Sequence, residues 1–236
     1  MEENELMSSL KVSKAVAKMA VPSVISSLVT VVYNMADTFF VGQTGDSLQV
    51  AAVSLTNPIF ILFMAFANML GMGGCAVASI AMGEQNGKRV RNASAFVIYA
   101  SLAIGICLCV ILMCFMNPIL NMFGADAQTY ELAKGYTFHI AFGAPFIIWS
   151  AAASFVVRAE GASKEAMIGS MIGTVVNIVL DPVMITGFGL GAAGAAIATM
   201  IGNILACGYF LWYFLRKSKV FSIHMRDFTL KDSIPA

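Results

Sequence analysis

Six long apolar segments constrain the fold of this 236-residue chain more than any other feature. Each supplies the roughly 20 residues that an α-helix needs to cross about 30 Å of lipid hydrocarbon. Only 11% of the residues are charged, against roughly 25% in soluble domains. The sequence therefore predicts an all-α, polytopic membrane protein with a six-helix transmembrane bundle over residues 1–215 and a tail over 216–236. The expected spans are residues 15–41, 51–81, 93–116, 131–156, 164–186 and 190–215.

The positive charges indicate how these spans are oriented. Thirteen of the 14 lysines and arginines fall in the N-terminal segment, the second and fourth connections and the tail. Lys134 alone lies on the other side, at the start of the fourth expected span. Basic residues collect on the cytoplasmic side of membrane proteins. We therefore expect a multi-pass protein of the plasma membrane with both termini in the cytoplasm.

Two aspartates, Asp37 and Asp181, lie deep inside the first and fifth spans, away from the few charged residues at the starts of these spans. A carboxylate at the centre of a membrane helix costs roughly 2.5–3.5 kcal/mol on insertion scales, so such residues usually serve a function. Asp37 precedes Gly42 by five residues, and Asp181 precedes Gly187 by six. At 1.5 Å per residue, both carboxylates lie roughly 7–9 Å below the outer helix ends. The spacing places the two aspartates in one layer of the outward half.

Further polar groups accompany each aspartate. Asn34 is three residues from Asp37, and Asn177 is four residues from Asp181, so each pair shares a helix face. Pro182 cannot donate to the carbonyl of Ile178, which predicts a freed oxygen and a kink. Carboxylate, amide and carbonyl oxygens are hard ligands that suit Na⁺. Two other interpretations remain open: the carboxylates could share a proton, or they could be helix-end acids satisfied by their neighbours.

Several function classes find no support in the sequence. The net charge of +1 argues against a nucleic-acid partner. The five cysteines lie in apolar runs, and no hydrolytic or ATP-binding motif is present, so we expect neither an enzyme nor a cofactor. The stretch 189–194 matches G-x-G-x-x-G, but no soluble strand precedes it. We interpret it, together with Gly169, Gly173 and Gly202, as a surface where helix backbones pack closely.

Prolines within the spans are candidate hinges. Broken helices let segments of a transporter bend between states, although proline is also simply commoner in membrane helices. Pro22 in the first span and Pro182 in the fifth are the principal hinge candidates.

Several motifs in chain order resemble the multidrug and toxin extrusion (MATE) transporters. The run from Tyr33 to Gly42, with Ala51-Ala52-Val53-Ser54, is similar to the first two helices of that family. Arg158-Ala159-Glu160-Gly161 resembles the loop after its fourth helix. The run 177–182, followed by 187–196, resembles its signature in helices 5 and 6.

This resemblance implies cation-coupled export of organic, cationic drugs or toxins by alternating access. Asp37, Asn177 and Asp181 match the family's cation- or proton-binding positions, which makes Na⁺ or H⁺ the expected coupling ion. Asn34 and Ser154 are expected supporting residues. Ser154 stands where many relatives carry asparagine, a departure that leaves the identity of the ion open.

The resemblance also implies that a second unit is required. The family has twelve spans in two lobes, and residues 228–236 resemble the linker into the seventh span. We therefore expect an N-terminal six-helix lobe that pairs with a C-terminal half or with a parallel copy of itself. Two alternatives remain: a lipid-linked-sugar flippase of the same superfamily, and a channel or structural membrane subunit.

Overall fold

The computed structural model describes residues 12–218, and within that range it contains helices and no strand. Six helices are long and apolar enough to cross a membrane, which confirms the predicted all-α class. Each expected span coincides with one of them to within a few residues. The elements are α2 (Val12–Gly42), α3 (Ser47–Gly83), α4 (Gly87–Cys114), α5 (Met116–Met122), α6 (Tyr130–Ala159), α7 (Ser163–Pro182), a π-helical turn η1 (Val183–Gly187) and α8 (Gly191–Arg216).

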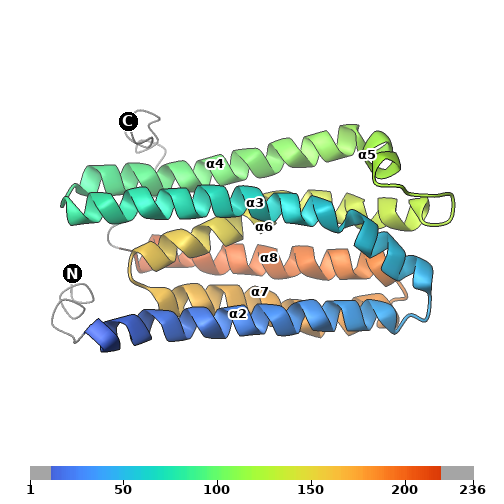
Figure 1. Cartoon of the computed structure of the whole chain (residues 1–236), viewed down its shortest axis with the longest axis horizontal. Helices are drawn as coiled ribbons and strands as arrows, with labels where there is room; N and C mark the ends of the chain where they lie inside the picture. The colour runs from blue at the N-terminus through green and yellow to red at the C-terminus, as the bar shows by residue number, and fades with distance from the viewer. Residues whose placement is uncertain (1–11, 219–236) are drawn as a thin grey trace.

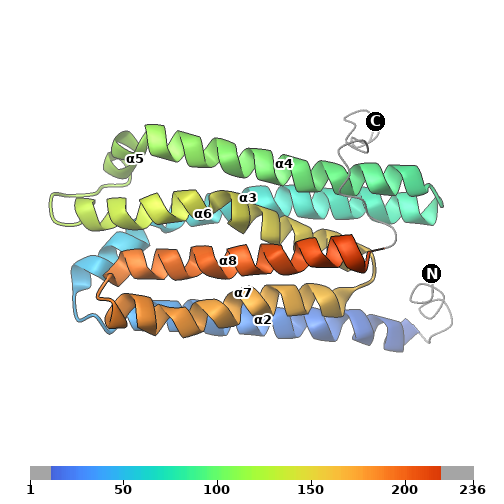
Figure 2. The same cartoon turned by 180° about the vertical axis from the view of Figure 1, so that it is seen from behind.

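The helices form two groups that run along a common axis (Figures 1 and 2). One group contains α3, α4 and α6, and the other contains α2, α7 and α8. Contact between α6 and α8 joins the groups. The first helix, α2, packs along α7 rather than along its sequence neighbour α3. This arrangement leaves space for a cavity between α2 and α3.

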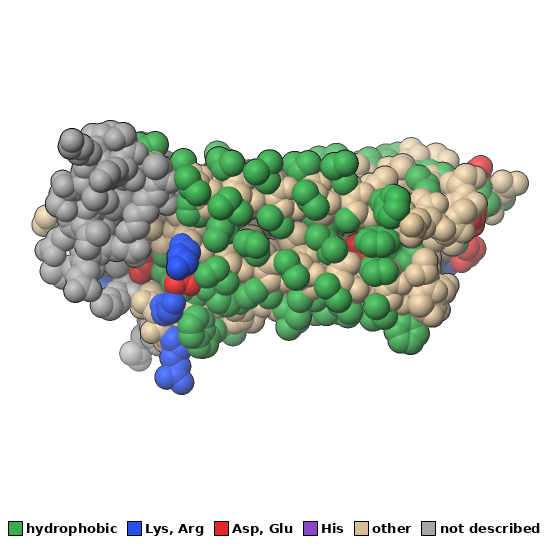
Figure 3. Space-filling view, turned by 90° about the horizontal axis from the view of Figure 1, so that it is seen from below, with side chains coloured by type: hydrophobic (Ala, Val, Ile, Leu, Met, Phe, Trp, Pro, Cys, Tyr) green, Lys and Arg blue, Asp and Glu red, His purple; other side chains and the backbone are tan. Residues whose placement is uncertain are grey.

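The charged residues divide the bundle into two unlike ends. The start of α2, the α3–α4 and α6–α7 connections and the end of α8 lie together at one end, which we call the basic end. Lysine and arginine side chains gather there, whereas hydrophobic side chains cover the length of the face on which α2 lies (Figure 3). At the opposite, distal end, Lys134 is the only basic residue within residues 12–218. The apolar length between two polar ends is what a bilayer requires.

Among the described helices, α6 is the most enclosed. In its most apolar stretch 72% of the residues are buried, against 12% for α2. Small residues such as Ala141, Ala144 and Ala152 line α6, and they let its neighbours approach closely. Much of α2, by contrast, carries exposed large apolar side chains, including Val24, Leu28 and Met35.

Helix ends are fixed by local polar contacts. The carboxylate of Asp46 accepts from the backbone N–H of Leu48 at 3.0 Å and caps α3. Asn86 caps α4 in the same way through the N–H of Arg89. The pair Asn117-Pro118, which is typical of a turn, lies instead inside the short helix α5, because proline fits the first turn of a helix, where its missing N–H has no partner.

The glycine-rich stretch at the start of α8 serves packing, as predicted. A Cβ on Gly194 would lie 2.7 Å from the backbone of Met184, and Gly191 adopts a φ of +54° beside the Gln49 side chain. Gln49 Oε1 accepts from the N–H of Ala192 at 2.6 Å and ties α3 to α8. Further along, a Cβ on Gly202 would lie 2.5 Å from the carbonyl oxygen of Gly173. The α7 and α8 backbones therefore touch directly, as small residues allow in membrane bundles.

Candidate cation and substrate site

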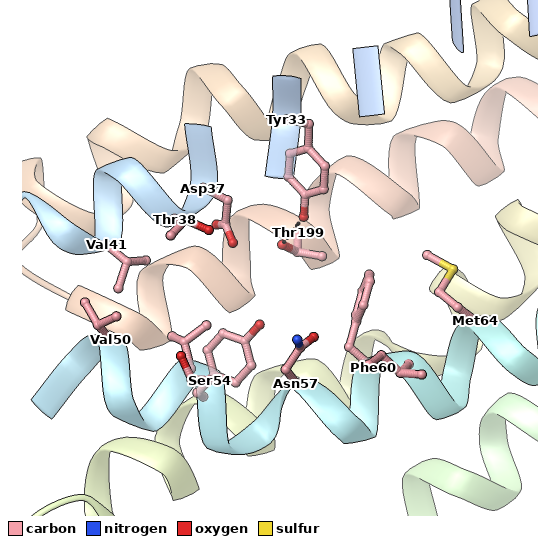
Figure 4. A pocket seen from close by; sticks show the side chains of 13 residues that line it. Tyr33, Asp37, Thr38, Val41, Val50, Ser54, Asn57, Phe60, Met64 and Thr199 are labelled. Carbon is pink, nitrogen blue, oxygen red and sulfur yellow. Dashed lines mark hydrogen bonds between the residues drawn. The ribbon is translucent and has the colours of Figure 1, made fainter. Parts of the chain in front are cut away.

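A cavity of about 500 Å³ lies between α2 and α3, in the half of the bundle nearer the distal end. We call it the outer cavity. Asp37, Thr38, Tyr33 and Thr199 lie on one side of it, and residues of α3 lie on the other (Figure 4). The described lining residues are Tyr33, Asp37, Thr38, Val41, Val50, Val53, Ser54, Asn57, Phe60, Ile61, Met64, Tyr136 and Thr199.

Asp37 is the only charged residue among the described residues that line the outer cavity. Its Oδ1 is buried and has no hydrogen-bond partner. Aromatic and thioether groups, including Phe60, Met64 and Tyr136, occupy other parts of the lining. Such surfaces attract organic cations and adapt to varied shapes. The outer cavity therefore combines one acid with a largely neutral wall.

Asp181 lies deeper, with 0% of its surface exposed, and it lines neither this cavity nor the second one described below. Its Oδ2 accepts from Nδ2 of Asn177 at 3.0 Å in the amide orientation that satisfies all neighbours of Asn177. In that orientation Asn177 Oδ1 accepts from the backbone N and from Oγ1 of Thr199, at 2.9 and 3.1 Å. The remaining oxygen, Oδ1 of Asp181, is buried without a partner.

A chain of polar contacts leads from α2, the helix that carries Asp37, to Asp181. Tyr33 lies one helical turn before Asp37, and its hydroxyl is 3.4 Å from Thr199 Oγ1. Because the Thr199 hydroxyl donates to Asn177, the Tyr33 hydroxyl acts as the donor in this contact. The chain from Tyr33 through Thr199 and Asn177 to Asp181 links α2, α8 and α7.

A second cavity of about 210 Å³ lies nearer the basic end, and we call it the inner cavity. Tyr33, Phe60, Met64 and Thr199 border both cavities. Asn177 faces the inner cavity rather than the outer one. Ser154 also lines the inner cavity, and its hydroxyl donates to the carbonyl of Ala151 at 2.9 Å.

The structure thus gathers Asp37, Asn177 and Asp181 around one polar chain, with Asp37 and Asn177 facing different cavities. Nothing is described of the Asn34 side chain, which lies outside the described part of the chain. Pro22 lies inside α2, and Pro182 ends α7 where the chain passes into η1. The hinge roles of both prolines stay predictions.

Sequence reasoning missed Tyr33 and Thr199, which connect α2 to Asn177 and Asp181. Tyr33 was recoverable in principle, because it stands four residues before Asp37 and shares its helix face. Thr199 had no such signal: it is a single hydroxyl in an alanine-rich helix, and helical threonine usually bonds its own backbone.

The oxygen atoms of this site suit a hard monovalent cation or a proton as ligand. The two unpartnered carboxylate oxygens and the nearby hydroxyls are oxygen ligands. Asn177 contributes its amide N–H₂ to Asp181 and uses its oxygen for Thr199, so it orients a carboxylate instead of offering a free oxygen. Within residues 12–218, no three His, Cys, Asp or Glu side chains group as a metal cluster would require.

Comparison with known proteins places this geometry in a family. The sequence model of the MatE family matches residues 22–183. The multidrug export protein MepA of Staphylococcus aureus (strain NCTC 8325 / PS 47) is 33% identical over 215 residues, which cover 91% of this chain and 48% of MepA. The chain thus spans about half the length of the curated relatives it matches.

Solved structures agree with the sequence comparison. A crystal structure of MATE in complex with MaD3S matches with a TM-score of 0.87 at 28% identity, covering 92% of this chain and 49% of the other. A MOP-superfamily transporter from Pyrococcus furiosus, described as having a binding pocket of reverse polarity that suggests a different function, matches with a TM-score of 0.84 at 28% identity, over 92% of this chain and 48% of its own. By sequence and by structure, the chain belongs to the MatE family of multidrug and toxin extrusion transporters.

Proposed function

We propose that this chain is the N-terminal half of a cation-coupled exporter of organic, cationic drugs or toxins. The observation that carries the proposal is the position of Asp37, which is the only charged residue among the described residues that line a cavity of about 500 Å³. The relationship to MepA, a multidrug export protein, supports the same assignment. Basic residues at one end favour a plasma-membrane orientation with that end, and both termini, in the cytoplasm.

Antiport follows from competition for the same carboxylates. In this proposal Na⁺ or a proton binds at Asp37 and Asp181, while Asn177 holds Asp181 in place. Departure of the ion leaves a buried negative charge, which is costly unless another cation compensates it. An organic cation beside Phe60 and Tyr136 supplies that compensation, so ion and drug occupy the lobe in turn.

The polarity of the outer cavity argues against a flippase for lipid-linked sugars. Such a substrate carries phosphate, which requires basic partners such as arginine or lysine. Among the described lining residues of either cavity there is no lysine or arginine. Because relatives with this fold differ in the polarity of their pockets, polarity is a better guide to function here than the fold.

A second six-helix unit completes the proposed transporter. The exposed apolar face of α2 and the outer cavity beside it offer one wall of a cleft. A C-terminal half or a parallel copy of this chain supplies the facing wall. Small organic substrates would then pass between the two units.

Gradient-driven efflux in liposomes tests the proposal. The chain is reconstituted with a second lobe, and export of ethidium is followed after imposing a Na⁺ or a pH gradient. Asp37→Asn and Asp181→Asn keep side-chain size but remove the charge, and we expect efflux to fall to the leak rate. Asp46→Asn is the matched control, because asparagine caps α3 as well as aspartate does.

The same assay separates the alternatives. If Asp37→Asn exports ethidium at the parental rate, the carboxylate does not couple transport and the proposal fails. A channel would dissipate the gradient without moving ethidium against its own gradient. Comparison of the two gradients identifies the coupling ion.

A further inference from the structure

Two helices carry polar stripes with the same spacing. Both stripes follow positions i, i+4, i+7 and i+11, which share one helix face. On α2 the stripe comprises Ser26, Thr30, Tyr33 and Asp37. On α7 it comprises Ser170, Thr174, Asn177 and Asp181.

The two stripes run in the same direction. Both α2 and α7 start at the basic end, and they pack against each other. Each stripe therefore leads from its aspartate toward the basic end, over about 16 Å at 1.5 Å per residue. An ionisable residue at membrane depth usually serves a function, and here each of the two aspartates ends a series of polar residues with the same spacing.

The inner cavity lies along these stripes. Thr30 and Tyr33 of α2 and Ser170, Thr174 and Asn177 of α7 line it. Two further helices add polar pairs four residues apart: Ser150 and Ser154 on α6, and Thr199 and Asn203 on α8. A volume of about 210 Å³ has room for several water molecules, each of which takes about 30 Å³ in the liquid.

Most of the hydroxyl hydrogens around this cavity are already used by the protein. Thr30 Oγ1 donates to the carbonyl of Ser26, and Thr174 Oγ1 donates to that of Ser170, at 2.9 and 3.1 Å. Ser150 Oγ donates to Asn203 Oδ1 at 2.8 Å, and Ser154 Oγ donates to the backbone. What remains on each hydroxyl oxygen is a lone pair. The inner cavity therefore favours a cation or a water molecule, which can offer hydrogens or positive charge, over an anion.

The cavity has one polar end and one apolar end. At the polar end Asn177 leads directly to Asp181. At the other end lies the ring of Phe210, which is 1% exposed and occupies space that a Cβ on Gly169 would need. Phe210 stands six residues before the end of α8, or about 9 Å from it. Phe210 thus borders the cavity on the side of the basic end, where it packs in a buried cluster with Tyr213 and Phe214.

We propose that the inner cavity is a hydrated passage for the coupling cation between the aspartates and the basic-end side of the membrane, with Phe210 as its gate. The passage rests on the proposed function in one respect only, namely that the cation which uses it drives export. It gives the ion a route within this lobe, separate from the outer cavity that would hold the drug.

Thiol accessibility tests the passage without any transport assay. The five native cysteines are replaced by alanine, and Thr174→Cys is introduced in membrane vesicles of either orientation. Two methanethiosulfonates are compared: the trimethylammonium reagent, which is cationic, and the ethylsulfonate reagent, which is anionic. We expect Thr174→Cys to react from the basic-end side at least about tenfold faster with the cation. The attraction between a cationic reagent and one carboxylate about 10 Å away, at an effective dielectric constant of about 20, is large enough to raise the reaction rate about tenfold.

The neighbouring residue provides the matched control. Val175 is 48% exposed on the outer surface of the same helix, where lipid surrounds it, and thiols in lipid do not ionise and so react poorly. Val175→Cys should therefore react with neither reagent. Phe210→Ala should raise the rate at Thr174→Cys several-fold, and Phe210→Leu, which keeps an apolar side chain there, should raise it less. Thermal unfolding in detergent identifies any variant that fails to fold.

The possible outcomes are distinct. Thr174→Cys that stays unreactive from the basic-end side, even in a folded Phe210→Ala or Phe210→Leu variant, would overturn the passage. Equal rates for cation and anion, or reaction from the distal side alone, would also overturn it. If the expected labelling appears but no gradient drives export, the passage stands and the proposed function fails. If gradient-driven export appears without labelling, the proposed function stands and the passage fails.

Discussion

At the scale of single residues, the central feature is a pair of buried carboxylates that are incompletely satisfied. Asp37 and Asp181 each keep one buried oxygen without a hydrogen-bond donor. Leaving a charged oxygen unpaired in a low-dielectric interior costs several kcal/mol, so native proteins avoid it unless a ligand or a proton completes the site. The pattern is what a site for an exchangeable cation requires.

The contact between Asn177 and Asp181 can be measured by a double-mutant cycle. We expect Asn177→Leu and Asp181→Leu each to destabilise the bundle, because each leaves a buried polar partner alone. The double variant should lose less free energy of unfolding than the two single variants lose together. We expect the difference, which is the coupling energy, to be about 0.6–1.7 kcal/mol, the range for hydrogen bonds in membrane helices. Unfolding in mixed detergent micelles measures all four proteins. Effects that add to within about 0.3 kcal/mol would mean that the contact contributes nothing.

The sequence predicted the two aspartates of this site better than the residues that link them to other helices. Asp37 and Asp181 were visible because charge in an apolar span is rare and costly. The roles of Tyr33 and Thr199 depend on which helices pack together, and α2 meets α7 and α8 only in three dimensions. Asn177 was expected to point into the same space as both acids, but whether it faces the outer or the inner cavity depends on the rotation of α7, which spacing alone does not fix.

At the scale of helices, direct backbone contact between α7 and α8 positions Asn177 beside Thr199. We expect Gly202→Ala to destabilise the protein by about 1–3 kcal/mol, as overpacking does, because its Cβ would press on the carbonyl of Gly173. Gly208→Ala on the same helix is the control, since nothing lies within 4 Å of its Cβ position. It should be neutral or stabilising by up to about 1 kcal/mol. Thermal unfolding compares the two, and equal midpoints would contradict the assigned contact.

The helix boundaries show where sequence patterns reach their limit. Apolar length predicted all six spans, because lipid requires it of each helix separately. The break at Pro182 was also predicted, yet its form, a π-helical turn over Val183–Gly187, was not. That form depends on how the freed backbone groups are satisfied, for example by Thr186 Oγ1, which donates to the Pro182 carbonyl at 2.6 Å. Such turns occur frequently at functional sites.

At the scale of the whole molecule, the unequal ends predict the orientation in the membrane. Lys88 and Gln128 are both exposed, at the basic and the distal end respectively. In a cysteine-free background, we expect Lys88→Cys to react with a membrane-impermeant thiol reagent only from the cytoplasm. Gln128→Cys should react only from outside. Labelling in intact cells and in inverted vesicles measures both, and the opposite pattern would reverse the proposed topology.

A second prediction at this scale concerns sufficiency. The outer cavity borders α2, whose apolar surface is largely exposed, so a single lobe supplies one wall of the proposed cleft. We expect the monomeric chain to fold but not to export, and export to appear only with a C-terminal lobe or as a parallel dimer. Liposomes that contain the chain at a density of one copy per vesicle provide the measurement. Gradient-driven ethidium efflux from such vesicles would show that one lobe suffices.

The packing of α2 along α7 has a consequence for how the protein is made. The first helix is complete once the ribosome has passed Gly42, but its partner ends at Pro182. At about 5–20 residues per second, the ribosome needs on the order of ten seconds to synthesise the intervening chain. During that interval the first helix, with Asp37 in it, waits in the bilayer or beside the insertion machinery without its partner. Asp37, on which we expect transport to depend, therefore also makes the insertion of this helix into the membrane less favourable during synthesis.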